Sequence, residues 1–212
     1  MQLDFQSISS SVRYKLLTAT IVPRPIALVT TLTPEGRTNA APFSFFNVFS
    51  ETPPLLVLGL QSKPDLTLKD TTENIRRTKE FVVNLVDEAM ASAMVKCAAD
   101  LASEESEIPY AGLSLTPSKW VNVDEISEAP FRFSCRVKDE LCYGDERTLI
   151  IGEVLGMTAS AGLIDPETMR VNWDQYSPVG RLFGSHYIRT NDQFSITAPD
   201  TVHPDAAGST PS

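Results

Sequence analysis

The chain has 212 residues, 42 % of them hydrophobic, with a formal net charge of −9 and an isoelectric point near 4.7. The length suits one large domain. The negative charge argues against nucleic acid as a main partner, since phosphate contacts need clustered Lys and Arg. Because the sequence contains no apolar run of about 18 residues, we expect no membrane span. The polar N-terminus lacks an apolar signal segment, which favours a cytoplasmic protein.

The cysteines and histidines give no sign of a disulfide framework or a metal site. Cys97, Cys135 and Cys142 are odd in number and form no CxxC pair, and a disulfide framework is unexpected in such a chain without a secretion signal. His186 and His203 are the only histidines, so the spacing of metal ligands is missing. We expect the cysteines to pack in or near the core.

The first predicted elements are a short helix and a β-hairpin. Residues 11–19 carry apolar side chains at helical spacing. The prolines at 23 and 25 then exclude a helix, and the apolar, β-branched run 26–32 predicts a central strand. Residues 33–36 have Pro and Gly at the positions that a type I turn prefers. A hairpin partner is therefore expected from Arg37 onwards.

Two further strands and two helices are predicted in the next part of the chain. The continuous apolar run 55–60 predicts a strand buried on both faces, and 81–86 predicts another. Asp70, with an acidic residue three positions later, is typical of the N-cap of a helix that runs to about Thr78. The Ala- and Met-rich residues 87–101 predict the second helix.

The rest of the chain is dominated by strands and turns. Three acidic residues in 102–112 predict an exposed loop. Further strand candidates are 113–123, 129–141 and 148–157, with short strand pieces and turns in 162–187. From Ala198 onwards the composition is typical of a disordered tail. Many short strands and few helices favour a mainly β fold, an antiparallel barrel with helical additions, as one domain over residues 1–197.

Several familiar catalytic motifs are absent from the sequence. It has no GxGxxG and no GxxxxGK[ST], so neither glycine loop that cradles phosphates is present. It has no GxSxG elbow, and with only two histidines a Ser-His-Asp site is not expected. No local arrangement of the acidic residues favours a glycosidase pair.

Two stretches remain as candidates for a site that binds an anionic, aromatic ligand. Lys69, Asp70 and Thr71 stand at a predicted helix start, where unpaired amides and the helix dipole favour an anion. The alternative is an ordinary capped surface helix. Residues 44–47 offer amides, a hydroxyl and aromatic faces that suit a planar heterocycle. The alternative there is ordinary strand packing.

These stretches, taken with others in order, resemble the flavin reductase-like, FMN-binding split-barrel family. The resemblance covers roughly residues 20–90 and continues more weakly to about Tyr187. The pieces that carry it are Val22-Pro23-Arg24-Pro25-Ile26-Ala27, Asn39-x-Ala41-Pro42-x-Ser44-x-Phe46-Asn47, Pro53-Pro54, Lys69-Asp70-Thr71-x-x-Asn74-Ile75 and Phe81-Val82-Val83-Asn84.

The resemblance implies a six-stranded Greek-key split β-barrel, a homodimer, and FMN held near the dimer interface. Residues 44–47 would lie along the isoalloxazine, and Lys69 and Thr71 would hold the phosphate with help from Arg24 or Ser62. Arg181, near the end of the ordered chain, is a further candidate for an anion contact. The residues that we expect to bind the cofactor are Arg24, Ser44, Phe45, Phe46, Asn47, Ser62, Lys69, Asp70, Thr71 and Arg181; no side chain is assigned as catalytic.

One departure from the family pattern leaves the use of nicotinamide open. Members that use it often have Gly-Asp-His ahead of the strand that ends in Gly-Glu-Val, whereas here residues 144–148 read Gly-Asp-Glu-Arg-Thr. The role of the missing His is then vacant or passes to Arg147. The first hypothesis is an FMN-binding reductase that takes hydride from NADH or NADPH and serves a monooxygenase or other redox partner. The alternatives are an FMN-carrying electron-transfer protein and a scaffold that has lost the flavin.

Overall fold

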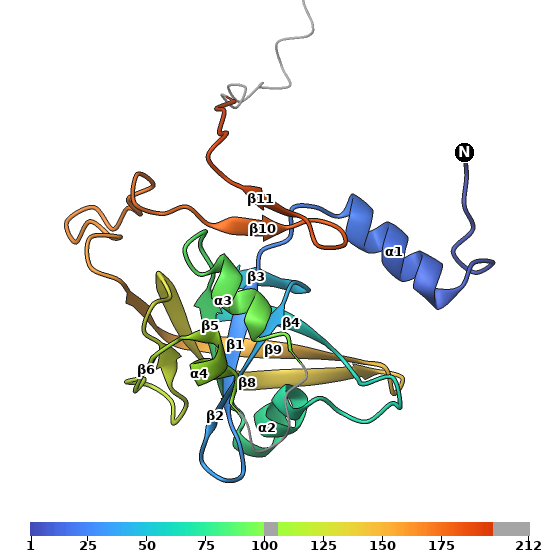
Figure 1. The fold of residues 1–212 in the computed structure, drawn as a ribbon, viewed down its shortest axis with the longest axis horizontal. Helices are drawn as coiled ribbons and strands as arrows, with labels where there is room; N and C mark the ends of the chain where they lie inside the picture. Colours follow the sequence, from blue (N-terminus) through green and yellow to red (C-terminus); the bar gives the residue numbers. More distant parts are fainter. Residues whose placement is uncertain (100–105, 197–212) are drawn as a thin grey trace, which may run out of the picture.

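The computed structural model describes residues 1–99 and 106–196, and it shows a mainly β fold (Figure 1). Seven antiparallel strands form one curved sheet in the order β2-β1-β5-β8-β9-β4-β3. The predicted tail from Ala198 and residues 100–105, which include the end of the helix predicted at 87–101, lie outside the described residues. The predicted class, an antiparallel barrel with helical additions, is confirmed.

The elements follow one another with short connections in most places. In chain order they are α1 Ser10–Thr20, β1 Ala27–Leu32, β2 Thr38–Phe43, β3 Phe46–Glu51, β4 Pro54–Gln61, α2 Asp70–Thr78, β5 Glu80–Leu85, α3 Ala91–Lys96, α4 Glu107–Ala111, β6 Leu115–Thr116, β7 Glu125–Ile126, β8 Phe131–Tyr143, β9 Arg147–Ala159, β10 Val179–Arg181 and β11 Tyr187–Arg189. Strands β6 and β7 pair with each other, as do β10 and β11.

The two edges of the large sheet, β2 and β3, are consecutive in the chain, and the corner at Ser44 and Phe45 joins them. This corner closes the sheet into a barrel. It also explains why the sheet has seven strands rather than the six that were expected, because the segment after Thr38 bends and divides into two strands. The Gly59 amide on β4 donates to the Phe45 carbonyl at 2.6 Å. A Cβ at Gly59 would meet the Phe45 Cβ at 3.0 Å, so a side chain there would crowd the corner.

Burial along the strands follows their place in the sheet. Strands β1 and β5 lie inside the sheet, and their central residues are buried on both faces. The expectation that 55–60 is also buried on both faces is wrong. On β4 the buried residues Leu56, Leu58 and Leu60 alternate with partly buried ones. The second face of that strand is therefore only partly covered.

The helices differ from the sequence predictions in extent and capping. Helix α2 has the predicted span, but its N-cap is Lys69 rather than Asp70, and no side chain caps it. The helix predicted at 87–101 is only Ala91–Lys96 within the described residues. Its start is delayed because residues 88–90 form a turn, across which the Asp87 carboxylate accepts the Met90 amide at 3.0 Å.

Two further predictions in the middle of the chain are corrected by the structure. The supposed loop at 102–112 contains α4, which is capped by Ser106 and ends at Gly112 with a φ of +74°. The strand predicted at 113–123 is reduced to the two residues of β6. None of the helices in the described residues is long and apolar enough to cross a membrane.

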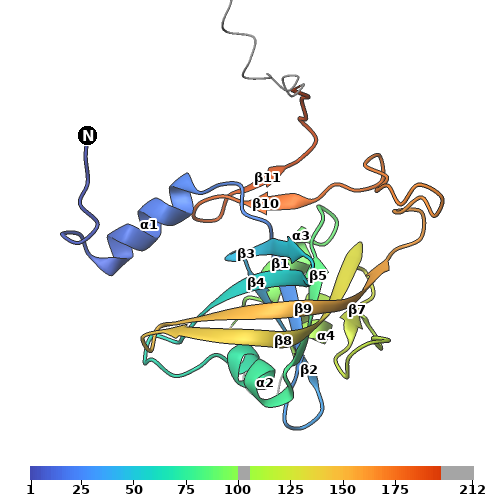
Figure 2. The ribbon, with the colours of Figure 1, turned by 180° about the vertical axis from the view of Figure 1, so that it is seen from behind.

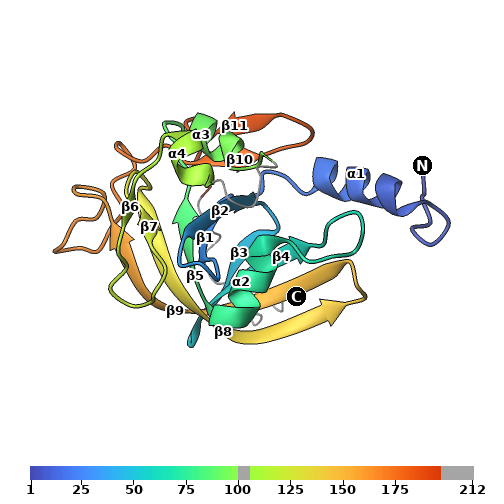
Figure 3. The ribbon, with the colours of Figure 1, turned by 60° about the horizontal axis from the view of Figure 1, so that its bottom comes forward.

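Helix α1 and the β10–β11 hairpin lie outside the barrel and contact each other. Helix α1 extends from the barrel beside the tip of the β10–β11 hairpin (Figures 1 and 3). The Arg24 side chain joins these parts, since Nη1 donates to the Thr18 carbonyl at 2.6 Å and Nη2 to the Leu182 carbonyl at 2.7 Å. The tip of the long β8–β9 hairpin projects from the barrel toward the same side of the molecule as α1, as the view from behind shows (Figure 2).

Candidate functional site

A groove follows the outer end of β2 and contains three adjoining cavities that share Pro42 in their lining. The first, about 600 Å³, lies at the start of α2. The second, about 160 Å³, lies at the barrel corner, and the third, about 630 Å³, lies between α1, α3 and the β10–β11 hairpin. We call the whole the β2 groove, with an α2 end, a corner and a hairpin end. The two larger cavities have the size that small molecules and cofactors need.

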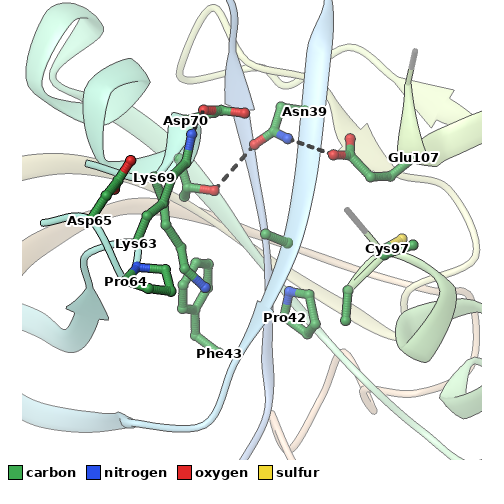
Figure 4. Close-up of a pocket in the computed structure, with 14 residues that line it drawn as sticks. Asn39, Pro42, Phe43, Lys63, Pro64, Asp65, Lys69, Asp70, Cys97 and Glu107 are labelled. Carbon is green, nitrogen blue, oxygen red and sulfur yellow. Dashed lines mark hydrogen bonds and ion pairs between the residues drawn. The ribbon is translucent and has the colours of Figure 1, made fainter. Parts of the chain in front are cut away.

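The α2 end is built on a polar network centred on Asn39 (Figure 4). Its Oδ1 accepts hydrogen bonds from Thr71 Oγ1 at 3.2 Å and from Thr31 Oγ1 at 3.3 Å. Its Nδ2 donates to Glu107 Oε1 at 3.0 Å, and the other Glu107 oxygen accepts the Ala40 amide at 3.3 Å. The network fixes the first turn of α2 against β2 and engages both carboxylate oxygens of Glu107, one of the acidic residues that line this cavity.

The start of α2 has the donors that an anion needs. The amides of Thr72 and Glu73 donate to the Lys69 carbonyl at 2.8 and 3.1 Å. The amides of Asp70 and Thr71 have no partner among the bonds of the described residues, and no side chain caps the helix. Unpaired amides at a helix N-terminus attract anions.

Two lysines stand beside these amides, on the side of the cavity opposite Asn39 and Cys97 (Figure 4). Lys63 Nζ lies 3.0 Å from Asp70 Oδ1, and this bond raises the pKa of Lys63 above its usual value. Lys63 therefore stays charged and offsets the carboxylate of Asp70. Lys69, the N-cap, is exposed and lines both this cavity and the corner.

The corner is lined by aromatic rings and by the guanidinium group of Arg147. The Arg147 guanidinium carbon lies 5.5 Å from the centre of the Phe45 ring and 5.9 Å from that of Tyr14, within cation–π range. Arg147 is the first residue of β9, directly after the Gly-Asp-Glu turn that lacks the expected His. Its side chain thus reaches the groove beside Lys69.

The hairpin end has two arginines in a mainly apolar wall. Arg24, only 9 % exposed, donates from Nε to Ser44 Oγ at 3.3 Å. Arg181 donates to the Tyr187 hydroxyl and the Gly184 carbonyl, and its guanidinium carbon lies 4.5 Å from the centre of the Tyr187 ring. The apolar wall comes from Ile26, Met94, Val95, Ala98 and Leu182.

Seven of the ten predicted site residues line the groove, at its α2 end, its hairpin end or its corner. Lys69, Asp70 and Thr71 lie together at the α2 end, as the sequence suggested. Arg24, Ser44 and Arg181 lie together at the hairpin end, and Phe45 lies at the corner between the two groups.

The other three predicted residues lie outside the groove lining. Phe46 packs against the barrel core. Asn47 is exposed, and its Oδ1 accepts the Val48 amide at 2.9 Å. Ser62 Oγ donates to the Asp145 carbonyl at 2.7 Å, so it ties the chain after β4 to the β8–β9 turn.

Sequence reasoning missed several residues of the groove. Asn39 belongs to the motif that carried the family resemblance, but we gave it no role. Its polar side chain, one residue before the buried Ala40, was a signal that could have marked it. Lys63 lies in a polar loop six positions before the N-cap and gave no local signal. Pro42, which lines all three cavities, was part of the motif and was not singled out.

Comparison with known proteins gives consistent results over nearly the whole chain. A family model described as flavin reductase like domain matches residues 19–180. The structure of 2-nitrobenzoate 2-nitroreductase NbaA from Pseudomonas fluorescens is 39 % identical, with a TM-score of 0.87, over 97 % of this chain and 100 % of that one. Nitrilotriacetate monooxygenase component B from Bacillus cereus is 33 % identical, with a TM-score of 0.86, over 92 % and 98 %.

A third structure is similar in fold alone. It is a protein with a split barrel domain from Shewanella frigidimarina, 16 % identical, with a TM-score of 0.79, over 94 % of this chain and 100 % of that one. The split-barrel fold that the sequence suggested is thereby confirmed.

Proposed function

This chain belongs to the flavin reductase-like domain family, a family of flavin-linked oxidoreduction, and we propose that it is an FMN-dependent oxidoreductase that takes hydride from NADH or NADPH. The observation that carries the proposal is the α2 end of the groove. There, uncapped helix amides and two lysines face a cavity that continues past an aromatic corner.

The phosphate of FMN fits the start of α2. The Asp70 and Thr71 amides would donate to its oxygens, and the ammonium groups of Lys63 and Lys69 would neutralise its charge. Asp70 contributes its amide, while its carboxylate is held by Lys63. A phosphate thus finds both hydrogen-bond donors and positive charge at this one place.

The flavin ring fits the stretch between the α2 end and the corner. Pro42, Phe43 and Phe45 line this stretch and supply apolar and aromatic faces for a planar ring. Ser44 lies at the barrel corner, where its hydroxyl and the neighbouring amides are available to the ring edge. When bound, the flavin accepts hydride from the nicotinamide and passes two electrons to an acceptor.

The protein then positions the flavin and the nicotinamide and polarises the flavin ring, and no side chain has to act as an acid or base. Donors near the reduced edge of the ring stabilise the negative charge that develops there. Arg147 is in place to attract the anionic nicotinamide cofactor, in the role that the expected His leaves vacant.

The acceptor that we propose is a nitroaromatic compound, because the NbaA nitroreductase is similar over nearly the whole of both chains. A partner monooxygenase is the other acceptor to consider, since nitrilotriacetate monooxygenase component B is also similar. We further propose a homodimer with FMN near its interface. In support, Val48 and Phe49 on the edge strand β3 are 69 % and 66 % exposed, and apolar residues on an edge strand favour association. The expected cytoplasmic location fits a user of NADH or NADPH.

A second candidate is an FMN-carrying electron-transfer protein with no nicotinamide site of its own. The absence of the His from residues 144–148 favours it. In that case the groove would bind FMN in the same way, and reduced flavin would arise only from a redox partner.

The test is anaerobic reduction of the FMN-loaded protein by NADH or NADPH, followed as flavin absorbance at about 450 nm. The proposal predicts rapid loss of absorbance with at least one of them, and free FMN without protein serves as control. No loss with either nucleotide, together with rapid loss on adding a reduced redox partner, would contradict the reductase and support the electron-transfer protein.

A further inference from the structure

The hairpin end of the groove has a feature that the proposed FMN site does not use. Arg24 and Arg181 lie directly opposite each other in an isolated antiparallel bridge. The Arg24 amide donates to the Arg181 carbonyl at 3.0 Å, and the Arg181 amide donates back at 2.8 Å. Like charges directly opposite across a strand pair destabilise it. The pair thus brings two cations together at the wall of one cavity of about 630 Å³.

Neither arginine has a carboxylate to balance it. The partners of Arg24 are the Ser44 hydroxyl and three backbone carbonyls, those of Thr18, Ile21 and Leu182. None of the ion pairs among residues 1–99 and 106–196 includes Arg24 or Arg181.

The lining of this cavity leaves the two charges uncompensated. Within the described part of the chain it contains no Asp or Glu. Burial of Arg24, together with the charge of Arg181, lowers the pKa of Arg24 below its usual value. A largely buried cation without a counter-ion is costly, and an anion in the cavity would remove that cost.

The remainder of the wall suits a ring rather than a small inorganic ion. Ile26 and Met94 are buried core residues, and Leu182 completes an apolar surface. The rings of Tyr14 and Tyr187 stand at its margin. The cavity shares Pro42 and Ser44 with the corner, so an occupant here would lie next to the place proposed for the flavin ring.

We propose that the hairpin end of the β2 groove binds an aromatic carboxylate, with its anionic group against the Arg24–Arg181 pair and its ring on the apolar wall. Guanidinium groups match the planar geometry of a carboxylate and donate paired N–H hydrogen bonds to its oxygens. The proposal rests on the proposed function only in that the bound compound is a nitroaromatic carboxylate, whose nitro group would take the two electrons of the reduced flavin. The binding itself depends on the pocket alone.

The test compares benzoate with benzamide, its neutral analogue, by isothermal titration calorimetry on the protein with and without FMN. The wild type should bind benzoate at least about tenfold more tightly than benzamide. Arg181→Gln should remove this preference. The matched control is Arg189→Gln on β11, because the Arg189 side chain is 70 % exposed and pairs with Glu88. This control should keep the preference in full.

Two further measurements keep the test decisive. Should Arg181→Gln fail to fold, titrations of the wild type in rising KCl replace it, and benzoate affinity should fall while benzamide affinity stays constant. Equal binding of the two ligands by the wild type, or a full benzoate preference in folded Arg181→Gln, overturns the proposal. A loss of FMN affinity in Arg181→Gln as large as that in Lys69→Ala also overturns it, because the pair would then hold the flavin phosphate.

The outcome for this pocket can be separated from that for the flavin site. If the wild type fails to bind FMN, the proposed function fails, yet the benzoate preference is still measurable in the FMN-free protein. If FMN binds and the benzoate preference is absent, only the carboxylate pocket is wrong.

Discussion

Thr71 Oγ1 donates to Asn39 Oδ1 at 3.2 Å and so joins the first turn of α2 to β2. The same Asn39 donates to Glu107 of α4 at 3.0 Å, so one side chain holds two helices against one strand. Since the first turn of α2 carries the proposed phosphate site, the geometry of that site depends on a residue that need not touch the ligand.

Asn39→Ala should lower both stability and FMN affinity. It would leave the hydroxyl of Thr71, a residue that is 2 % exposed, and the Glu107 carboxylate short of partners. Loss of such bonds costs about 1–3 kcal/mol. Urea unfolding of the FMN-free protein measures this cost. The exposed Asn191→Ala is the control and should stay within about 0.5 kcal/mol of the wild type. An Asn39→Ala protein as stable as the wild type would show that the network contributes little.

Lys69→Ala should weaken FMN binding by about 1 kcal/mol or more, which is about fivefold in the dissociation constant. The reason is the lost charge at the helix start, where Lys69 lines two of the cavities. Fluorescence titration at low salt measures the change. Lys119→Ala, at an exposed position outside the groove lining, removes the same charge and should have no effect. An unchanged dissociation constant in Lys69→Ala would remove this residue from the site.

The protein should lose stability as pH rises above about 8.5, where thiols of an unfolded chain lose their protons. Burial raises the pKa of Cys97 to about 12 and that of Cys135 still further. The folded state therefore keeps protons that the unfolded state releases. The free energy of unfolding should fall by about 1.4 kcal/mol per pH unit for each buried thiol.

Substitution of one thiol checks that pH dependence. In Cys97→Ala, urea unfolding between pH of about 8.5 and 10 should show a shallower fall in stability, by one thiol's share. Ser92→Ala is the control and should keep the wild-type slope, because Ser92 is exposed on α3, the helix that Cys97 ends, and its hydroxyl does not titrate in this range. If Cys97→Ala leaves the slope of unfolding free energy against pH unchanged, the thiol of Cys97 titrates alike in the folded and unfolded states.

Much of the barrel could be predicted because its signals are local. The run 26–32 and its turn defined a hairpin, and the start of α2 was visible at 69–71 from residue types alone. The opposition of Arg24 and Arg181 could not be predicted, because it joins residues at opposite ends of the chain through one isolated bridge. The shortening of α3 was missed for a different reason, since helix propensity is overridden when Asp87 holds the chain in a turn.

The central claim is that the start of α2 holds the phosphate of FMN, and the most direct test compares FMN with riboflavin, which lacks that phosphate. Fluorescence titration of the FMN-free protein should show saturable FMN binding, at least about tenfold tighter than that of riboflavin. The difference in affinity between FMN and riboflavin should be smaller in Lys69→Ala. No binding of FMN, or equal affinity for the two flavins, would contradict the account.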